Sequence, residues 1–246
     1  MKAWGLAVFA LIMGATAVCA ELPSECAVAE HLVGPDFGLP RVAKAIAQKK
    51  LTVLVVGAGS STLPGAVAKA YPDRLQAALV ETLPGVEVKV QADTKPGRTA
   101  QAAVKPLIAD LASVRPAVVV WQTGTVDAMK SVDPDEFSAA LDKGISAAHS
   151  ADSDIVLLNA QYSPRTESII ALGQYIDHIR WVGLRHEIPV FDRYGIMKLW
   201  AELGTFDFVT HTKKLDMAEH VHDCIGRLLA ELILKSAKEA PTQGAR

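Results

Sequence analysis

Leu51-Thr-Val-Leu-Val-Val-Gly57 is an almost uninterrupted apolar run, and a small-residue loop, Gly57-Ala-Gly-Ser-Ser-Thr62, follows it directly. A short apolar run that ends at such a loop predicts a strand buried on both faces. Strands of this kind belong to parallel sheets that carry helices on both sides. In these sheets the chemistry sits in the loops at the carboxyl ends of the strands. The Gly57–Thr62 loop is therefore the first place to look for a functional site.

The rest of the chain alternates between strand-like and helical patterns, as a parallel sheet requires. Further strands are expected at 86–90, 117–121, 154–158 and 189–191, and helices at 73–83, 99–114, 134–150, 167–186 and 215–235. The strict alternation of Val86-Glu-Val-Lys-Val90 predicts a half-exposed strand, whereas the others are mostly apolar. The sequence therefore predicts an α/β fold with three layers, a doubly wound and mostly parallel sheet of the flavodoxin-like type.

The size, composition and net charge of the chain exclude some classes of function. The chain has 246 residues, of which 50% are hydrophobic and 21% charged, and this is enough for one sizeable domain core. Lys and Arg number 25 against 27 Asp and Glu, so the formal net charge is -2. Without a basic excess, nucleic acid is not expected as a partner.

The first twenty residues look like an export signal. Lys2 is the only charge before an apolar run, and Val18-Cys-Ala20 places small residues before a cleavage point. A membrane anchor is the alternative, although the run is short for a ~20-residue span. We expect a signal peptide at 1–20, an N-terminal extension at 21–48, the α/β domain at 49–237 and a flexible tail at 238–246. The mature protein would be periplasmic or secreted, with no stable membrane span.

Two cysteines remain after cleavage, Cys26 and Cys224. In an oxidising compartment such a pair predicts one disulfide, while two unrelated buried thiols are the alternative. The bond would close a very long loop and, on the chain-entropy model, could stabilise the fold by roughly 4–5 kcal/mol.

The loop after the first strand fits none of three common motifs. Thr62 stands where a dinucleotide fingerprint has its third glycine and where a nucleophile elbow has its last one. No Gly-Lys-Ser/Thr follows, so the loop is not a phosphate-binding P-loop. What remains is a serine at a strand end among small neighbours.

Several segments, in order, resemble the sequence blocks of the SGNH (GDSL-type) hydrolases, particularly exported bacterial members. They are Gly59-Ser-Ser-Thr62, Tyr71-Pro-Asp-Arg-Leu-Gln-Ala-Ala-Leu79, Pro96-Gly-Arg-Thr-Ala100, Val119-Val-Trp-Gln-Thr-Gly-Thr-Val-Asp-Ala128, Asn159-Ala-Gln-Tyr-Ser-Pro164 and His222-Asp-Cys-Ile-Gly226. The resemblance spans about residues 40–235. It implies an SGNH-hydrolase-like fold and a serine-dependent ester hydrolase or acyl transferase.

The resemblance also implies residue roles. Ser60 would be the nucleophile, and the backbone N–H groups of Ser60 and Gly97 would hold the oxyanion. Apart from the resemblance, a bound ligand is expected near Ser60, with Arg98, Gln161 and Tyr162 as the ligand-binding residues. The plainer alternative is that Ser60 caps a turn and that Gly97 only permits a positive φ.

The chain departs from the family pattern at its polar catalytic positions. Val126 stands where an asparagine side chain should donate to the oxyanion, and Lys213 and Asp216 stand where the Asp and the His base should be. If the alignment with the family is shifted by four residues, His220 takes the place of the base and Asp216 becomes its orienting partner. The two side chains could then pair, because residues four apart share a helix face. A charged, solvated helix face is the alternative, and His211 is a further candidate base.

No cofactor or metal is expected. His220-Val-His222 is the one pair of possible ligands, and two histidines alone do not make a metal site. The sequence therefore suggests an exported ester hydrolase or acyl transferase with an impaired catalytic set, acting on a small ester or an O-acylated glycan. The alternative is a non-catalytic ligand- or glycan-binding protein on the same fold. The oligomeric state is not predicted.

Overall fold

The computed structural model describes residues 22–63, 65–209 and 215–239. Five parallel strands form one sheet in the order β2-β1-β3-β4-β5. The strands are β1 (Lys50–Gly57), β2 (Glu87–Thr94), β3 (Val118–Gln122), β4 (Asp154–Leu158) and β5 (Val190–Phe191). The predicted α/β fold with a parallel central sheet is confirmed. The predicted signal peptide at 1–20 and the last residues of the predicted tail, 240–246, lie outside the described residues.

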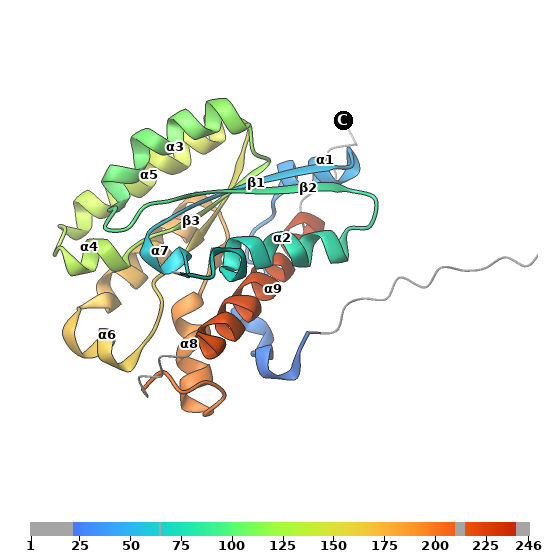
Figure 1. The fold of residues 1–246 in the computed structure, drawn as a ribbon. Coiled ribbons are helices and arrows are strands. Elements are labelled where there is room, and N and C mark those ends of the chain that lie inside the picture. The colour runs from blue at the N-terminus through green and yellow to red at the C-terminus, as the bar shows by residue number, and fades with distance from the viewer. Residues whose placement is uncertain (1–21, 64, 210–214, 240–246) are drawn as a thin grey trace, which may run out of the picture.

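Helices cover both faces of the sheet (Figure 1). They are α1 (Pro40–Ala47), α2 (Tyr71–Thr82), α3 (Ala100–Val114), α4 (Thr125–Met129), α5 (Pro134–Ser150), α6 (Pro164–Ile169), α7 (Leu172–His186), α8 (Arg193–Glu202) and α9 (Asp216–Glu239). Four short 3-10 helices are η1 (Ser24–Cys26), η2 (Glu30–Leu32), η3 (Gly59–Ser61) and η4 (Val67–Lys69).

The pleat of the central strands divides the core in two. Val53 and Val55 of β1 face a cluster formed with α1, α2, α8 and α9. Leu54 and Val56 face the opposite cluster, formed with α3, α5 and α7. β3 and β4 are buried at every residue, while the edge strand β2 is partly exposed along its length. The apolar runs therefore became central strands and the alternating run became the edge.

Three of the described α-helices were not predicted, and one was predicted too long. α1, α4 and α8 have no counterpart in the sequence-based assignment. The helix expected at 167–186 is instead α6 and α7, separated by Ile170, whose backbone is extended. Two β-branched residues, Ile169 and Ile170, stand at this break and have modest helix propensity.

The N-terminal residues pack on the sheet domain. In α1, Val42 and Ala45 are buried in the core, and the buried Asp154 of β4 accepts hydrogen bonds from the backbone N–H groups of Arg41 and Val42. η1 is held by the disulfide between Cys26 and Cys224, whose Cα atoms lie 5.0 Å apart. The predicted disulfide is confirmed.

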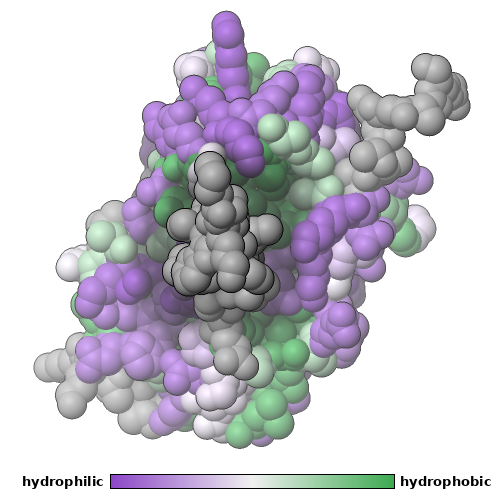
Figure 2. All heavy atoms as spheres, turned by 90° about the vertical axis from the view of Figure 1, so that its right-hand side faces the viewer, coloured by the Kyte–Doolittle hydropathy of each residue, from purple (hydrophilic) through white to green (hydrophobic). Residues whose placement is uncertain are grey.

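Figure 2 looks onto the side of the molecule at the right of Figure 1 and shows mostly hydrophilic residues with apolar patches between them. Among the described residues, no helix combines the length and apolar character needed to cross a bilayer.

α2 and α9 approach each other so closely that Gly226 leaves no room for a side chain. A Cβ built there would lie 2.5 Å from the Cβ of Arg74 and 2.8 Å from the backbone N of Leu75. We therefore expect Gly226→Ala to destabilise the fold by about 1–3 kcal/mol, despite the better helix propensity of alanine. Urea denaturation would measure this.

Gly173 in α7 is the matched control, because a Cβ added there would meet nothing within 4 Å. Gly173→Ala should be neutral or stabilise by up to about 1 kcal/mol. If both variants change the free energy of unfolding by the same amount and in the same direction, α2 and α9 leave room for a Cβ at Gly226.

Candidate active site

The carboxyl ends of the parallel strands bring together side chains from distant parts of the chain. Ser60 follows β1, Gly97 follows β2, Gln122 ends β3, Gln161 follows β4 and Arg193 follows β5. The carboxyl end of β1 lies at the topological switch point, because β2 and β3 flank it on either side. This is the expected place for a site.

The Ser60 turn is compact and closely braced. Ser60 lies in η3 and is half-buried, and Ser61 beside it is buried. Gly57, the last residue of β1, is required there, because a Cβ at this position would lie 2.1 Å from the Ser61 Oγ. The hydroxyl of Thr62 donates to the carbonyl of Gly59 at 2.8 Å and closes the turn.

Gln122 fixes the hydroxyl of Ser60. Its Oε1 accepts hydrogen bonds from Ser61 Oγ at 2.8 Å and from Arg193 Nη1 at 3.1 Å. The amide nitrogen is thereby turned toward Ser60 and donates to the Ser60 Oγ. Because an amide nitrogen has no acceptor capacity, Gln122 cannot take up the proton of Ser60. It holds the Ser60 hydroxyl without taking its proton.

Arg193 is a buried cation beneath the same turn, with only 1% of its surface exposed. Its guanidinium donates to the carbonyl of Ser60 at 3.0 Å and to Gln161 Oε1 at 3.5 Å, and it lies 5.7 Å from the ring centroid of Tyr71. These partners are all neutral. Burial lowers the pKa of Arg193 to about 10, so it remains charged at neutral pH. Its positive potential favours negative charge that develops near Ser60.

His222 is the histidine that lies against this cluster. Its Nδ1 accepts a hydrogen bond from the backbone N–H of Tyr71 at 2.9 Å, and its ring stacks on the Tyr71 ring with 6.0 Å between the centroids. Burial, and then the charge of Arg193, lower the pKa of His222 to about 3. The imidazole is therefore neutral, and its Nδ1 is already engaged as the acceptor for a backbone N–H of α2.

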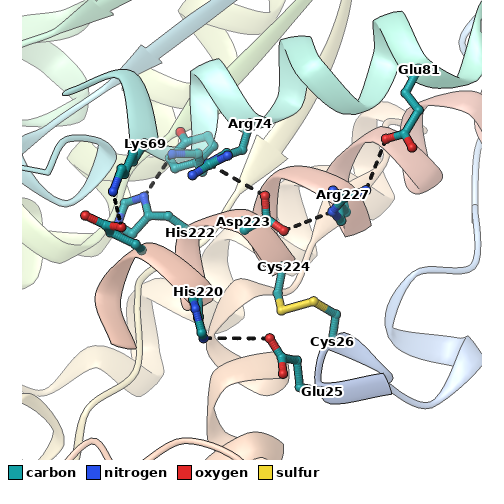
Figure 3. Close-up of polar contacts among 12 residues, drawn as sticks. Glu25, Cys26, Lys69, Arg74, Glu81, His220, His222, Asp223, Cys224 and Arg227 are labelled. Carbon is teal, nitrogen blue, oxygen red and sulfur yellow. Dashed lines mark hydrogen bonds and ion pairs between the residues drawn. A yellow bond between two sulfur atoms is a disulfide. The ribbon is translucent and has the colours of Figure 1, made fainter. Parts of the chain in front are cut away.

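His220 points in a different direction. On α9 it is rotated by about 200° from His222, its side chain is 64% exposed, and its Nδ1 lies 3.7 Å from Glu25 Oε1 (Figure 3). The expected pairing of His220 with Asp216 is not formed. The disulfide provides the reason, because it anchors η1, and with it Glu25, beside this part of α9.

No histidine among the described residues makes a hydrogen bond with the Ser60 Oγ. His211, a candidate base, and Lys213, which stands at the family's Asp position, lie outside the described residues. The catalytic roles of Ser60, Gly97, Asp216 and His220 therefore stay predictions.

The Gly97 loop stands next to the Ser60 turn. A Cβ on Gly59 would lie 3.9 Å from the Cβ of Pro96, the neighbour of Gly97. Gly97 has a φ of 72°, a conformation that favours glycine, and its carbonyl accepts a hydrogen bond from Lys130 Nζ at 2.9 Å. The loop is exposed and can present its backbone to a ligand.

Arg98, expected in the ligand pocket, is engaged by the protein itself. It is 9% exposed and donates to the carboxylate of Asp93 and to the carbonyl of Gly57, the latter at 3.1 Å. It thus ties the ends of β1 and β2 together and braces the Gly97 loop.

Asp127 has a structural role in the neighbouring loop. Its buried carboxylate accepts from the backbone N–H of Ala100 at 2.9 Å and from Thr123 Oγ1 at 3.3 Å. Burial raises the pKa of this carboxyl group. Val126 beside it has no side-chain hydrogen-bond donor.

Of the two other expected ligand residues, Gln161 touches the site and Tyr162 lies mainly in the core. Gln161 accepts the hydrogen bond from Arg193. Tyr162 is 8% exposed and packs edge-on against Tyr194 and Phe208. Among the described residues, no group of three or more His, Cys, Asp or Glu side chains is placed to hold a metal ion.

Sequence reasoning missed Gln122, Arg193, Tyr71 and His222 as site residues. A polar residue at the end of the apolar β3 run was a usable signal for Gln122, because a buried amide needs partners. Arg193 carried no comparable signal, since it is 133 residues from Ser60 in the chain.

Residues 25–239 match the non-GDSL lipase-like family, and this stretch includes every residue of the site. The chain belongs to the non-GDSL lipase-like family. No curated protein shows significant sequence similarity to it. The family match covers nearly the whole described chain.

Solved structures agree with the family on the fold. A lipase/acylhydrolase from Enterococcus faecalis superposes with a TM-score of 0.61 at 20% identity, covering 74% of this chain and 95% of that one. A catalytic mutant of Axe2, an acetylxylan esterase from Geobacillus stearothermophilus, gives 0.60 at 15% identity, with 74% and 94% covered. TesA gives 0.56 at 21% identity, with 76% and 98% covered. The predicted SGNH resemblance is confirmed, as a lipase-like SGNH fold.

Proposed function

We propose that this member of the non-GDSL lipase-like family cleaves small carboxylic esters slowly, with Ser60 as the nucleophile. The observation that carries the proposal is the fixed Ser60 hydroxyl at the carboxyl end of β1, held by Gln122 beside the Gly97 loop. The substrate class would be a small ester or an O-acylated glycan. The acetylxylan esterase among the structural neighbours supports an acetylated glycan as the first to test.

In the proposed reaction, the Ser60 Oγ attacks the ester carbonyl and the alcohol leaves. Water then releases the acid and regenerates the hydroxyl. The backbone N–H groups of Ser60 and Gly97 would stabilise the oxyanion. The buried charge of Arg193, which contacts the Ser60 carbonyl, would favour the same negative charge.

Slow turnover follows because no described residue is placed to act as a base on the Ser60 hydroxyl. A serine hydroxyl is a weak nucleophile unless a neighbouring group takes its proton. The histidines of α9 are engaged elsewhere, and Gln122 cannot act as a base. His211 is the candidate base outside the described residues, and hydroxide from solvent would serve in its absence.

The first test is labelling with a fluorophosphonate, together with hydrolysis of a short aryl acetate. We expect the mature protein to gain one phosphonyl group on Ser60 and Ser60→Ala to lose at least about 100-fold in hydrolysis. Ser113→Ala on the exposed surface of α3 is the matched control and should behave as wild type. Equal hydrolysis and labelling in wild type and Ser60→Ala would refute the proposal.

Histidine variants would locate the base. Because His220 is exposed and paired with Glu25, His220→Ala should retain hydrolysis within about twofold. If only His211→Ala loses hydrolysis, and the wild-type rate falls as the pH drops below a pKa near that of histidine, His211 is the base. A large loss in His220→Ala would instead restore the Asp216–His220 hypothesis.

A second candidate is a non-catalytic ligand-binding protein. It is favoured by the absence, among the described residues, of an imidazole in contact with the Ser60 hydroxyl. Wild type that neither hydrolyses the acetate nor takes up the label would favour it, and binding of acetylated xylo-oligosaccharides would then be measured by calorimetry.

We also propose export. The predicted signal peptide and the disulfide between Cys26 and Cys224 support it, because such bonds persist in oxidising compartments. N-terminal sequencing of the protein recovered from the periplasm or medium should start at Glu21.

A further inference from the structure

A cavity of about 490 Å³ lies at the amino ends of β1 and β3, at the end of the strands opposite to Ser60. One wall is a single face of α1, formed by Arg41, Lys44, Ala45 and Gln48, and the other is the turn from α3 into β3. In Figure 1, α1 lies at the right, while α4 and α6, which follow the carboxyl ends of β3 and β4, lie at the left. The cavity is therefore separate from the candidate active site.

The lining is strongly cationic. Arg41, Lys44, Lys50 and Arg115 all contribute, whereas the one acidic lining residue is Asp152. Arg41 is already paired, with Asp152 at 3.1 Å and Asp154 at 3.4 Å. Lys44, Lys50 and Arg115 are exposed and make no ion pair with any described residue. Three uncompensated cations thus meet in one hollow of a chain whose net charge is -2.

The backbone around the cavity is also unusual. Arg115, which ends α3, has a φ of 49°, and Lys49, which precedes β1, has a φ of 61°. Helix ends of this conformation favour glycine, because a Cβ is strained there. Arg115 therefore keeps a cationic side chain at a position where glycine would be easier to accommodate.

The positions of the helix ends explain some of the positive charges in the cavity lining but not all of them. α1 and α3 both end near the cavity, and cations stabilise helix C-termini. That effect fades within the last turn and acts on each helix separately. It does not account for Lys50, which lies on β1, or for the convergence of three elements on one hollow.

We propose that this cavity binds a compact polyanion, a ligand with two or more phosphate or carboxylate groups. Its volume lies within the range of small-molecule sites. The guanidinium of Arg115 suits a planar, bidentate contact, and the lysines act as point charges. None of the lining residues is aromatic, so charge rather than stacking on a base or a sugar ring selects the ligand. The site does not depend on the Ser60 chemistry.

The test is calorimetric titration of the mature protein, disulfide intact, with sodium pyrophosphate and separately with citrate at low ionic strength. We expect saturable one-to-one binding. The triple variant Lys44→Gln, Lys50→Gln, Arg115→Gln should weaken it at least tenfold. Binding of pyrophosphate alone would assign a phosphate ligand, and binding of citrate alone a carboxylate ligand.

The matched control removes three exposed lysines elsewhere, through Lys89→Gln, Lys105→Gln and Lys143→Gln. It changes the net charge equally and should stay within about twofold of wild type. Equal weakening in both triple variants would show general charge attraction and overturn the proposal. So would wild type that binds neither anion at millimolar concentration.

Arg115→Gly separates binding from folding. Because glycine relieves the left-handed backbone, the variant should unfold at the wild-type temperature or above it, while its affinity for the anion falls several-fold. Unchanged affinity in Arg115→Gly together with unchanged affinity in the triple variant would remove the proposed site.

Discussion

Acidification from pH 7 to pH 4 is expected to lower the free energy of unfolding by about 3 kcal/mol through His222 alone. The cause is the difference between its pKa of about 3 in the folded protein and its ordinary value of 6.5. The ring is buried beneath α2 and near the charge of Arg193. A proton on its Nδ1 would break the hydrogen bond from the Tyr71 N–H and place a second positive charge beside Arg193.

The direction follows from where the proton is bound. Between pH 6.5 and about 3 the unfolded chain protonates His222 while the folded chain does not. Stability due to this group is therefore fully present above pH 6.5 and is lost progressively as the pH falls toward 3. No further loss from His222 is expected below that pH.

Urea denaturation at several pH values between 7 and 4 would measure the effect. His222→Asn is the matched variant, because its side-chain oxygen can accept the hydrogen bond from the Tyr71 N–H but does not titrate. The variant should be less pH-dependent than wild type by about 3 kcal/mol over this range. If both proteins lose the same stability on acidification, His222 is not held neutral in the folded state.

Loss of the Cys26–Cys224 disulfide should cost more than any substitution on the surface. The bond joins residues 198 apart, and the chain-entropy model gives about 5 kcal/mol for a loop of this length. For a domain of this size, that loss corresponds to a fall of roughly 10–20 °C in the midpoint of thermal unfolding. The double variant Cys26→Ala, Cys224→Ala would measure it.

Reductant provides the internal control. Dithiothreitol should destabilise wild type to about the level of the double variant and leave the double variant unchanged. Both cysteines are buried, so alanine there also removes some packing. A double variant as stable as oxidised wild type would mean that the Cys26–Cys224 bond adds nothing to the stability of the folded state.

The same disulfide bears on the candidate site. It holds η1 and Glu25 against α9, and His220 pairs with Glu25 there (Figure 3). His222, on the other side of the helix, is committed to the backbone of Tyr71. Both histidines of α9 are thus engaged by other parts of the chain, which is why slow, Ser60-dependent turnover is the function that we propose.

Much of the fold was predictable from local pattern. The apolar run at 51–57 predicted a strand buried on both faces and the alternating run at 86–90 a half-exposed one, because burial on two faces or on one selects different residues. The order of the motifs predicted the family fold. Helix α8 was missed, although Asp192 caps it by accepting from the Gly195 N–H, a signal that lay in the sequence.

By itself, the sequence indicated where the strands lie, that the sheet is mostly parallel, that Ser60 stands at a strand end, and that Cys26 and Cys224 are candidates for one disulfide. Only the tertiary structure decided what surrounds Ser60. Gln122 and Arg193 reach it from 62 and 133 residues away, and His220 turns to Glu25 rather than to Asp216. The physical reason is that hydrophobic periodicity records how each element is buried, whereas contacts between polar side chains depend on how distant elements dock against one another.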